Sequence, residues 1–253
     1  MKLYAITFSP TGGTQKVADR LIRGLEGEPV AVDLTDSQAD FSAVALTEED
    51  VAVIAVPSYG GRVPGIAVQR LSAVKGGGAR AVLVCVYGNR AYEDTLVELE
   101  DAAKAAGFRV VAAVAAIAEH SIAHKYAAGR PDAEDDRQLL DFAAKIQEKL
   151  AAGDTTQPII PGNRPYKKFG VISMMPKPTK DCVSCGLCAA KCPVQAIDPK
   201  DPKHTDEDKC IFCMRCVSVC PHSARKVDSL RLAAIDVALK KVCSDRKEGE
   251  LYL

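Results

Sequence analysis

Short apolar runs alternate with amphipathic stretches along the first 150 residues of the chain. The apolar runs are rich in Val, Ile and Ala, and each is continuous enough to form a strand buried on both faces of a parallel sheet. They span residues 3–8, 30–34, 51–56, 79–87 and 109–118. Helix-like segments lie between and after them, at about residues 14–26, 65–74, 93–106 and 132–151. This alternation predicts an α/β fold with a five-stranded, doubly wound parallel sheet.

The loop after the first predicted strand is a candidate phosphate-binding site, because ligands of doubly wound sheets bind at the carboxyl ends of the strands. Small residues, three hydroxyl groups and a following helix favour binding of a phosphate through backbone N–H groups. The residues are Ser9, Thr11, Gly12, Gly13 and Thr14. The loop contains no Lys or Arg and matches neither a Walker loop nor G-x-G-x-x-G, so a simple helix-capping turn is the alternative.

Two further loops bring glycines and aromatic side chains to the same edge of the predicted sheet. Glycine lets a ligand approach the backbone closely, and an aromatic ring can cover a planar ligand. The loop after the third strand contains Pro57, Ser58, Tyr59, Gly60 and Gly61. The loop after the fourth strand contains Tyr87, Gly88, Asn89, Arg90 and Tyr92. Three such loops in succession favour a flavin site over an α/β domain without a cofactor.

Eight of the ten cysteines lie within residues 182–220, where the pattern C-x2-C-x2-C-x3-C-P occurs twice. In this pattern the first three thiolates hold one 4Fe–4S cluster, and the fourth ligates the other cluster. The spacing therefore predicts two crossed sets of ligands. The first set is Cys182, Cys185, Cys188 and Cys220, and the second set is Cys210, Cys213, Cys216 and Cys192. Disulfides and zinc sites are the alternatives, but no signal peptide is evident and zinc motifs usually pair two C-x2-C units.

These motifs carry two family resemblances. Residues 180–227 resemble a two-cluster bacterial ferredoxin, and every ligand position is filled. Residues 1–150 resemble flavodoxin, which implies FMN as the cofactor, with its phosphate wrapped by the loop at residues 9–14. The resemblance implies that Tyr59 and Tyr92 flank the flavin ring. It also implies that Asn89 and the backbone of Gly88 and Arg90 face the pyrimidine edge.

The chain departs from the flavodoxin pattern in two places. Gly13 stands where the family usually has Asn, and the chain contains no Trp. Both departures bear on how tightly FMN is held. A backbone carbonyl that can turn toward flavin N5 would tune the one-electron potentials, and Gly60 or Gly61 would permit that movement.

Nearly the full length resembles the flavodoxin–ferredoxin fusion proteins of anaerobic bacteria and archaea. The predicted domains are a flavodoxin-like FMN-binding domain at residues 1–150 and a small α+β two-cluster ferredoxin domain at residues 180–228. Residues 151–179 form a Pro- and Gly-rich linker, and residues 229–253 form a helix, expected at 229–243, and a tail. Basic linker residues such as Arg164 and Lys167 either join two acidic bodies electrostatically or are simply solvated.

Composition narrows the class of protein. The 253 residues carry a formal net charge of zero and show no feature of nucleic-acid binding. The longest apolar stretches are too short to span a bilayer, so no membrane association is expected. With no targeting segment evident and with thiolate-rich sites, we expect a soluble cytoplasmic protein from an anaerobe.

The predicted cofactors indicate electron transfer. Electrons would pass between two 4Fe–4S clusters and FMN, with a redox protein or a small electron acceptor as the partner, and no residue needs to act as an acid, base or nucleophile. The alternative is an FMN-dependent reductase of a small acceptor, fed by the clusters. A redox-sensing module would need an exposed reactive thiol, for which only Cys243 is a candidate. The oligomeric state stays open.

Overall fold

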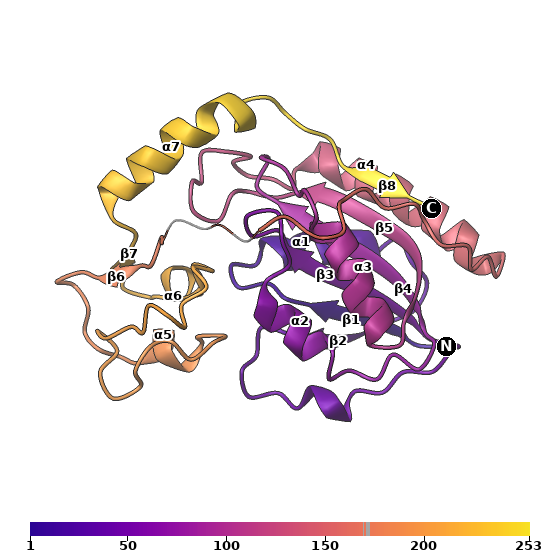
Figure 1. Ribbon diagram of the computed structural model, residues 1–253, viewed down its shortest axis with the longest axis horizontal. Coiled ribbons are helices and arrows are strands. Elements are labelled where there is room, and N and C mark those ends of the chain that lie inside the picture. Colours follow the sequence, from indigo (N-terminus) through magenta and orange to yellow (C-terminus); the bar gives the residue numbers. More distant parts are fainter. Residues whose placement is uncertain (169, 171–172) are drawn as a thin grey trace.

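The structure is a computed structural model that describes residues 1–168, 170 and 173–253. Its main feature is a six-stranded sheet with the order β2-β1-β3-β4-β5-β8 (Figure 1). Five strands are parallel: β1 (Leu3–Thr7), β2 (Pro29–Asp33), β3 (Val51–Pro57), β4 (Arg80–Tyr87) and β5 (Arg109–Ile117). The order 2-1-3-4-5 is the flavodoxin-like form of the doubly wound sheet, so the predicted fold class is confirmed.

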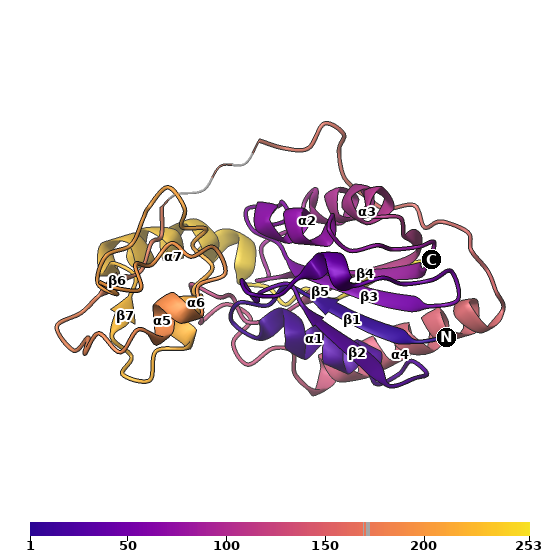
Figure 2. The same cartoon turned by 90° about the horizontal axis from the view of Figure 1, so that it is seen from below.

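Helices cover both faces of this sheet, as Figure 2 shows. One face is packed by α1 (Gly13–Ile22) and α4 (Ala133–Ala151). The other face is packed by α2 (Gly65–Leu71) and α3 (Thr95–Ala105). All four helices lie within the predicted segments or one residue from them, and a single-turn 3-10 helix (Phe41–Ala43) precedes β3. The apolar stripe of each helix and the all-apolar central strands therefore form two cores, one on each side of the sheet.

Strand β2 differs from the expectation that every strand is buried on both faces. Only Val32 is buried in β2, and Val30 is 43% exposed. The expectation was wrong for this strand because β2 lies at the edge of the sheet, where it pairs only with β1 among the described strands.

The C-terminal part has little regular structure, as expected of a small cluster-binding domain. It contains α5 (Leu187–Ala190), α6 (Arg215–Ser218) and an antiparallel pair of β6 (Lys177–Pro178) and β7 (Arg225–Lys226). The two cysteine motifs share one backbone pattern, because positive φ values occur at matching positions. The pairs are Ser184 at 55° and Phe212 at 53°, Gly186 at 77° and Met214 at 61°, and Gln195 at 51° and Ser223 at 48°.

Helix α7 (Ser229–Cys243) connects this part back to the sheet (Figure 1). It occupies the residues predicted for it, and Asp228 caps its first turn by accepting from the N–H groups of Leu230 and Arg231. After α7 the chain returns to the sheet edge and forms β8 (Glu250–Tyr252), antiparallel to β5. Strand β8 was not predicted, because three residues are too few for a recognisable period.

The linker follows α4 and contacts α3. The N–H of Asn163 donates to Asp94 Oδ1 at 2.9 Å. Arg164 forms ion pairs with Glu100 and Asp101, each at 2.7 Å, and Lys167 pairs with Glu93. Arg164 and Lys167 are therefore paired with acidic residues of the first domain. Residues 169, 171 and 172 of the predicted linker lie outside the described residues.

Candidate cofactor-binding site

A cavity of about 510 Å³ lies at the carboxyl ends of β1, β3 and β4. All three loops singled out in the sequence contribute to its wall. The predicted residues that line it are Thr11, Gly13, Thr14, Pro57, Ser58, Tyr59, Gly60, Tyr87, Gly88 and Arg90. Its volume is in the range of small-molecule and cofactor sites, so the predicted edge of the sheet does hold a ligand-sized space.

The first loop fits a phosphate group. Gly12 is the N-cap of α1 with φ 89°, and a Cβ there would meet no atom within 4 Å. Since no side chain of the cap residue covers the first turn, the N–H groups of Gly13 and Thr14 at the start of α1 remain available to an anion. Ser9 does not line the cavity. Its Oγ accepts from the N–H of Gln15 at 2.9 Å and its N–H donates to Thr35 Oγ1 at 2.7 Å, so it braces the loop.

The second loop is a tight turn in which Tyr59 and Arg62 exchange backbone hydrogen bonds at 3.0 and 3.2 Å. The two central glycines have φ values of 60° and 84°, a conformation that disfavours other residues. Gly60 lines the cavity, whereas Gly61 packs against Glu93 and its carbonyl accepts from the N–H of Asp94 at 3.1 Å. Of the two carbonyls proposed to turn, only that of Gly60 is without such an anchor in the described part of the chain.

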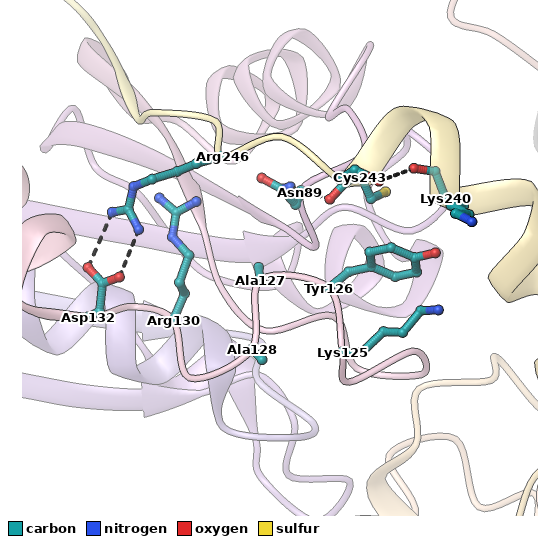
Figure 3. Close-up of a pocket in the computed structure, with 11 residues that line it drawn as sticks. Asn89, Lys125, Tyr126, Ala127, Ala128, Arg130, Asp132, Lys240, Cys243 and Arg246 are labelled. Atoms are coloured by element: carbon teal, nitrogen blue, oxygen red, sulfur yellow. Dashed lines mark hydrogen bonds and ion pairs between the residues drawn. The ribbon is translucent and has the colours of Figure 1, made fainter.

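The third loop departs from the expected arrangement at two side chains. Asn89 Nδ2 donates to the carbonyls of Cys243 and Asp245, both at 2.8 Å, and Figure 3 shows Asn89 turned toward Cys243. Tyr92 bonds through its hydroxyl to Tyr252 at 2.8 Å and to Glu250 at 2.7 Å. Neither side chain lines the cavity, because the C-terminal segment occupies both. The structure thus does not bring the Asn89 and Tyr92 side chains to the cavity where their flavin contacts were expected.

His120 follows β5 and lines the cavity beside Gly88. Its Nδ1 accepts from the N–H groups of Ile122 at 3.2 Å and Ala123 at 3.1 Å, which leaves the ring proton on Nε2. Burial, and then the charge of His124, lower the pKa of His120 from 6.5 to about 4. It is therefore neutral at physiological pH and can serve only as a fixed hydrogen-bond donor.

Part of the remaining wall comes from segments that carry no flavin-binding motif. Ile211 and Phe212 lie between two predicted cluster ligands, and Ile211 also packs against the core of the first domain. Helix α7 adds Arg231, Ala234, Ile235, Ala238 and Leu239. Apolar residues at helical spacing are typical of a helix that packs on a neighbour, but this pattern in α7 could not identify the cavity as that neighbour.

The four thiols of the second set, Cys192, Cys210, Cys213 and Cys216, line one small internal cavity. Cys192 comes from the first motif and joins three cysteines of the second motif, as crossed ligation requires. The Sγ of Cys192 accepts from the N–H of Ala196, and the Sγ of Cys220 accepts from the N–H of Ala224, both at 3.3 Å. In the first set, Cys185 is exposed and Cys188 is buried.

The chemistry of these thiols fits the iron ions of a 4Fe–4S core, which are positively charged and are held by thiolates. Burial raises the pKa of Cys213 and of Cys216 to about 12, so thiolates at these positions need adjacent positive charge, which iron supplies. No disulfide links any of the ten cysteines, all of which are described. Within the described ranges, no three His, Cys, Asp or Glu side chains converge closely enough to hold a single metal ion.

A second cavity, of about 450 Å³, lies beside the C-terminal segment (Figure 3). Its charged walls are largely neutralised, because Arg130 pairs with the buried Asp135 and Arg246 pairs with Asp132 at 2.8 Å. Cys243 also lines it but is only 2% exposed, and burial raises the pKa of its thiol. This environment disfavours the redox-sensing role considered for Cys243.

Comparison with known proteins supports the assignment of the cysteine-rich part. Residues 181–225 match the family described as "4Fe-4S dicluster domain". This match indicates 4Fe–4S chemistry in that segment and, with the flavodoxin-like sheet, electron transfer in general. A search of curated proteins gives no match.

Several solved structures are similar to the first part of the chain. A flavodoxin from the domain Archaea is 15% identical, with a TM-score of 0.41 over 60% of this chain and 99% of its own. Megasphaera elsdenii flavodoxin is 17% identical, with a TM-score of 0.40 over 56% and 98%. Bacillus cereus flavodoxin 1 is 19% identical, with a TM-score of 0.43 over 58% and 98%. The fold assignment itself rests on the strand order.

In the described part of the chain, no helix combines the length and the apolar character needed to cross a bilayer.

Proposed function

We propose that the chain is an electron-transfer flavoprotein in which two 4Fe–4S clusters exchange electrons with FMN. FMN would occupy the cavity at the ends of β1, β3 and β4, and the two crossed cysteine sets would hold the clusters. A cubane cluster transfers one electron at a time, and FMN supplies both one- and two-electron chemistry. The residues of the chain would bind and orient these groups and exclude water between them.

A single observation carries the proposal. The cavity lined by the three strand-end loops is also lined by Ile211 and Phe212, which lie between the cluster ligands Cys210 and Cys213. The two candidate sites therefore share a wall. Electron transfer between protein-bound groups requires such proximity, and a fusion of both domains in one chain maintains it.

Contacts between the domains indicate which cluster faces the flavin cavity. Arg215, between two ligands of the second set, donates from Nη1 to the carbonyl of Pro10 at 3.0 Å. Arg70 donates from Nη2 to the carbonyl of Pro193, which follows the ligand Cys192, at 2.5 Å. Both contacts involve the second set. We therefore assign the cluster of the second set to the flavin side of the electron path.

The first set suits the opposite end of the path. Cys185 is exposed, and Val183 in the same loop is 62% exposed. A partner protein could approach this cluster without disturbing the domain interface. Electrons would then pass between the partner, the first cluster, the second cluster and FMN, in either direction.

The residues that α7 and the cluster loop add to the cavity wall favour an electron carrier over a reductase of a small acceptor. Helix α7 contributes Ala234, Ile235 and Ala238 to the wall, and the cluster loop contributes Phe212. A reductase would need space above the flavin ring for its substrate. Here the open side of the three loops faces the C-terminal part of the same chain.

Anaerobic reconstitution followed by reductive titration tests the proposal. Ultraviolet–visible and EPR spectroscopy should reveal about eight irons and one FMN for each chain, with two cluster signals. The matched control is a Cys182→Ser/Cys213→Ser variant, which should retain FMN while losing both intact clusters. Two irons or fewer with zinc present, or failure to retain FMN, would contradict the proposal.

A further inference from the structure

Arg225 is a fully buried guanidinium without a carboxylate partner. It is 1% exposed and is among the largest fully buried side chains of the protein. Its Nη1 donates to Thr205 Oγ1 at 2.9 Å and to the carbonyl of Pro176 at 3.4 Å, and its Nη2 donates to the carbonyl of Pro202. Nε has no partner, and no ion pair involves this residue in the described part of the chain. A buried charge of this kind is costly unless an anion compensates it.

The cavity lined by the second cysteine set indicates where that anion lies. Pro176 and Thr205, which accept hydrogen bonds from Arg225, line this cavity together with Cys192, Cys210 and Cys216. A cubane held by four thiolates is anionic, so it would provide the missing counter-charge.

The internal repeat shows that the first half lacks this charge. Ala196 and Ala224 occupy matching positions, because each donates its N–H to the fourth cysteine of its motif at 3.3 Å. The next residue is Ile197 in the first half and Arg225 in the second half. Ile197 is 3% exposed and packs in an apolar cluster with Cys188. The two halves of the repeat therefore differ by one buried positive charge.

We propose that Arg225 is a positioning residue that compensates the charge of the second cluster and raises its reduction potential above that of the first cluster. The inference rests on the proposed function. Reduction adds one negative charge to a cluster, and a fixed nearby cation stabilises the more negative form. The guanidinium cannot lose its proton in the protein, so the effect persists across the working pH range. The resulting order of potentials favours electron flow from the exposed cluster toward the flavin cavity.

Potentiometric EPR titration of the full, reconstituted chain tests the inference. Arg225→Gln and Arg225→Ile remove the charge, and Arg225→Lys retains it. Both neutral variants should shift the reduction equilibrium of the second cluster at least tenfold toward the oxidised form, which is about 59 mV for one electron. The lysine variant should remain close to the wild type, and the signal of the first cluster should move much less.

Control variants identify the signals and separate the possible failures. Cys185→Ser assigns the first cluster, Cys213→Ser assigns the second, and Ile197→Val is the matched apolar control. If both signals move equally, or neither moves, Arg225 does not have this role. If the neutral variants do not assemble clusters, the reduction potentials of the two clusters in the wild type decide. A second cluster with a lower potential than the first overturns the inference. Absence of clusters in the wild type would instead contradict the proposed function.

Discussion

The side chain of Asn89 donates a hydrogen bond of 2.8 Å to the carbonyl of Cys243, which is the last residue of α7. A second bond from the same Nδ2 reaches the carbonyl of Asp245. The loop after β4 thus holds the end of α7, a helix that lines the candidate flavin cavity, and the segment that continues into β8. A residue at the predicted flavin site therefore has a structural role between domains.

Replacing Asn89 with Ala should release this C-terminal segment. The change leaves two carbonyls without their donor, and we expect a loss of about 1–2 kcal/mol in the free energy of unfolding. Urea denaturation measures the loss, and hydrogen exchange should show weaker protection at residues 244–252. Gln38→Ala removes an exposed amide and is the matched control. Unchanged stability and protection, with weakened FMN binding, would instead favour the contact with the pyrimidine edge expected from the family resemblance.

The two glycines of the second loop should respond differently to substitution. Gly60→Ala introduces a Cβ at positive φ beside the cavity, and it should change the two one-electron potentials of the flavin by hindering movement of the Gly60 carbonyl. Each tenfold change in the relative stability of two flavin states corresponds to about 59 mV. Spectroelectrochemical titration measures both potentials. Potentials equal to those of the wild type would exclude this carbonyl as the group that tunes them.

Gly61→Ala is the matched control, and its effect should fall on stability. A Cβ at Gly61 would lie 1.8 Å from Glu93 Oε2, and the residue has φ 84°. Strain in the left-handed region and the clash together should lower the free energy of unfolding by roughly 1–3 kcal/mol. Thermal denaturation of both variants distinguishes the two effects.

The sequence predicted the sheet well because its central strands are apolar throughout and the connecting helices have clear stripes. It predicted the three loops because glycine and hydroxyl residues cluster at strand ends. The sequence places Tyr92 and Asn89 at the flavin site by their positions in the loop. Their side chains instead bond to Tyr252 in β8 and to Cys243, more than 150 residues away in the chain, and no local sequence pattern reveals such contacts. The position of Phe212 in the cavity wall could not be predicted for a similar reason, because it depends on how the two domains pack.

One position in the matching backbone of the two cysteine motifs also shows that a local sequence pattern does not reveal contacts between domains. Ser184 and Phe212 both adopt φ near 50–55°, a conformation in which a bulky residue is unusual. Their alignment follows from the repeated spacing. The sequence does not explain why Phe212 is larger than Ser184. The structure relates the larger side chain to the wall of the candidate flavin cavity, which Phe212 lines.

Protonation of His120 should destabilise the protein at low pH. The pKa of His120 is lowered to about 4, chiefly by burial, so the unfolded chain binds a proton more readily. The stabilising contribution is complete above about pH 6.5 and is lost as the pH falls toward 4, with a total of at most roughly 3 kcal/mol. Urea midpoints between pH 7 and pH 4.5 should decline less in His120→Gln than in the wild type. An equal decline in both proteins would contradict this account, and His222→Gln, at an exposed position, is the control.

Crossed ligation can be tested by serine substitution of the fourth cysteine in each motif. Cys192 lies in the first motif, yet it shares a cavity with Cys210, Cys213 and Cys216. Cys192→Ser should therefore alter the same EPR signal as Cys213→Ser, and Cys220→Ser should alter the same signal as Cys185→Ser. Each should reduce the intact 4Fe–4S signal by about half, because one cluster of two loses a thiolate. Cys85→Ala, in the core outside the motifs, should leave both signals unchanged. If Cys192→Ser and Cys185→Ser affect the same signal, each motif holds its own cluster and the crossed sets are wrong.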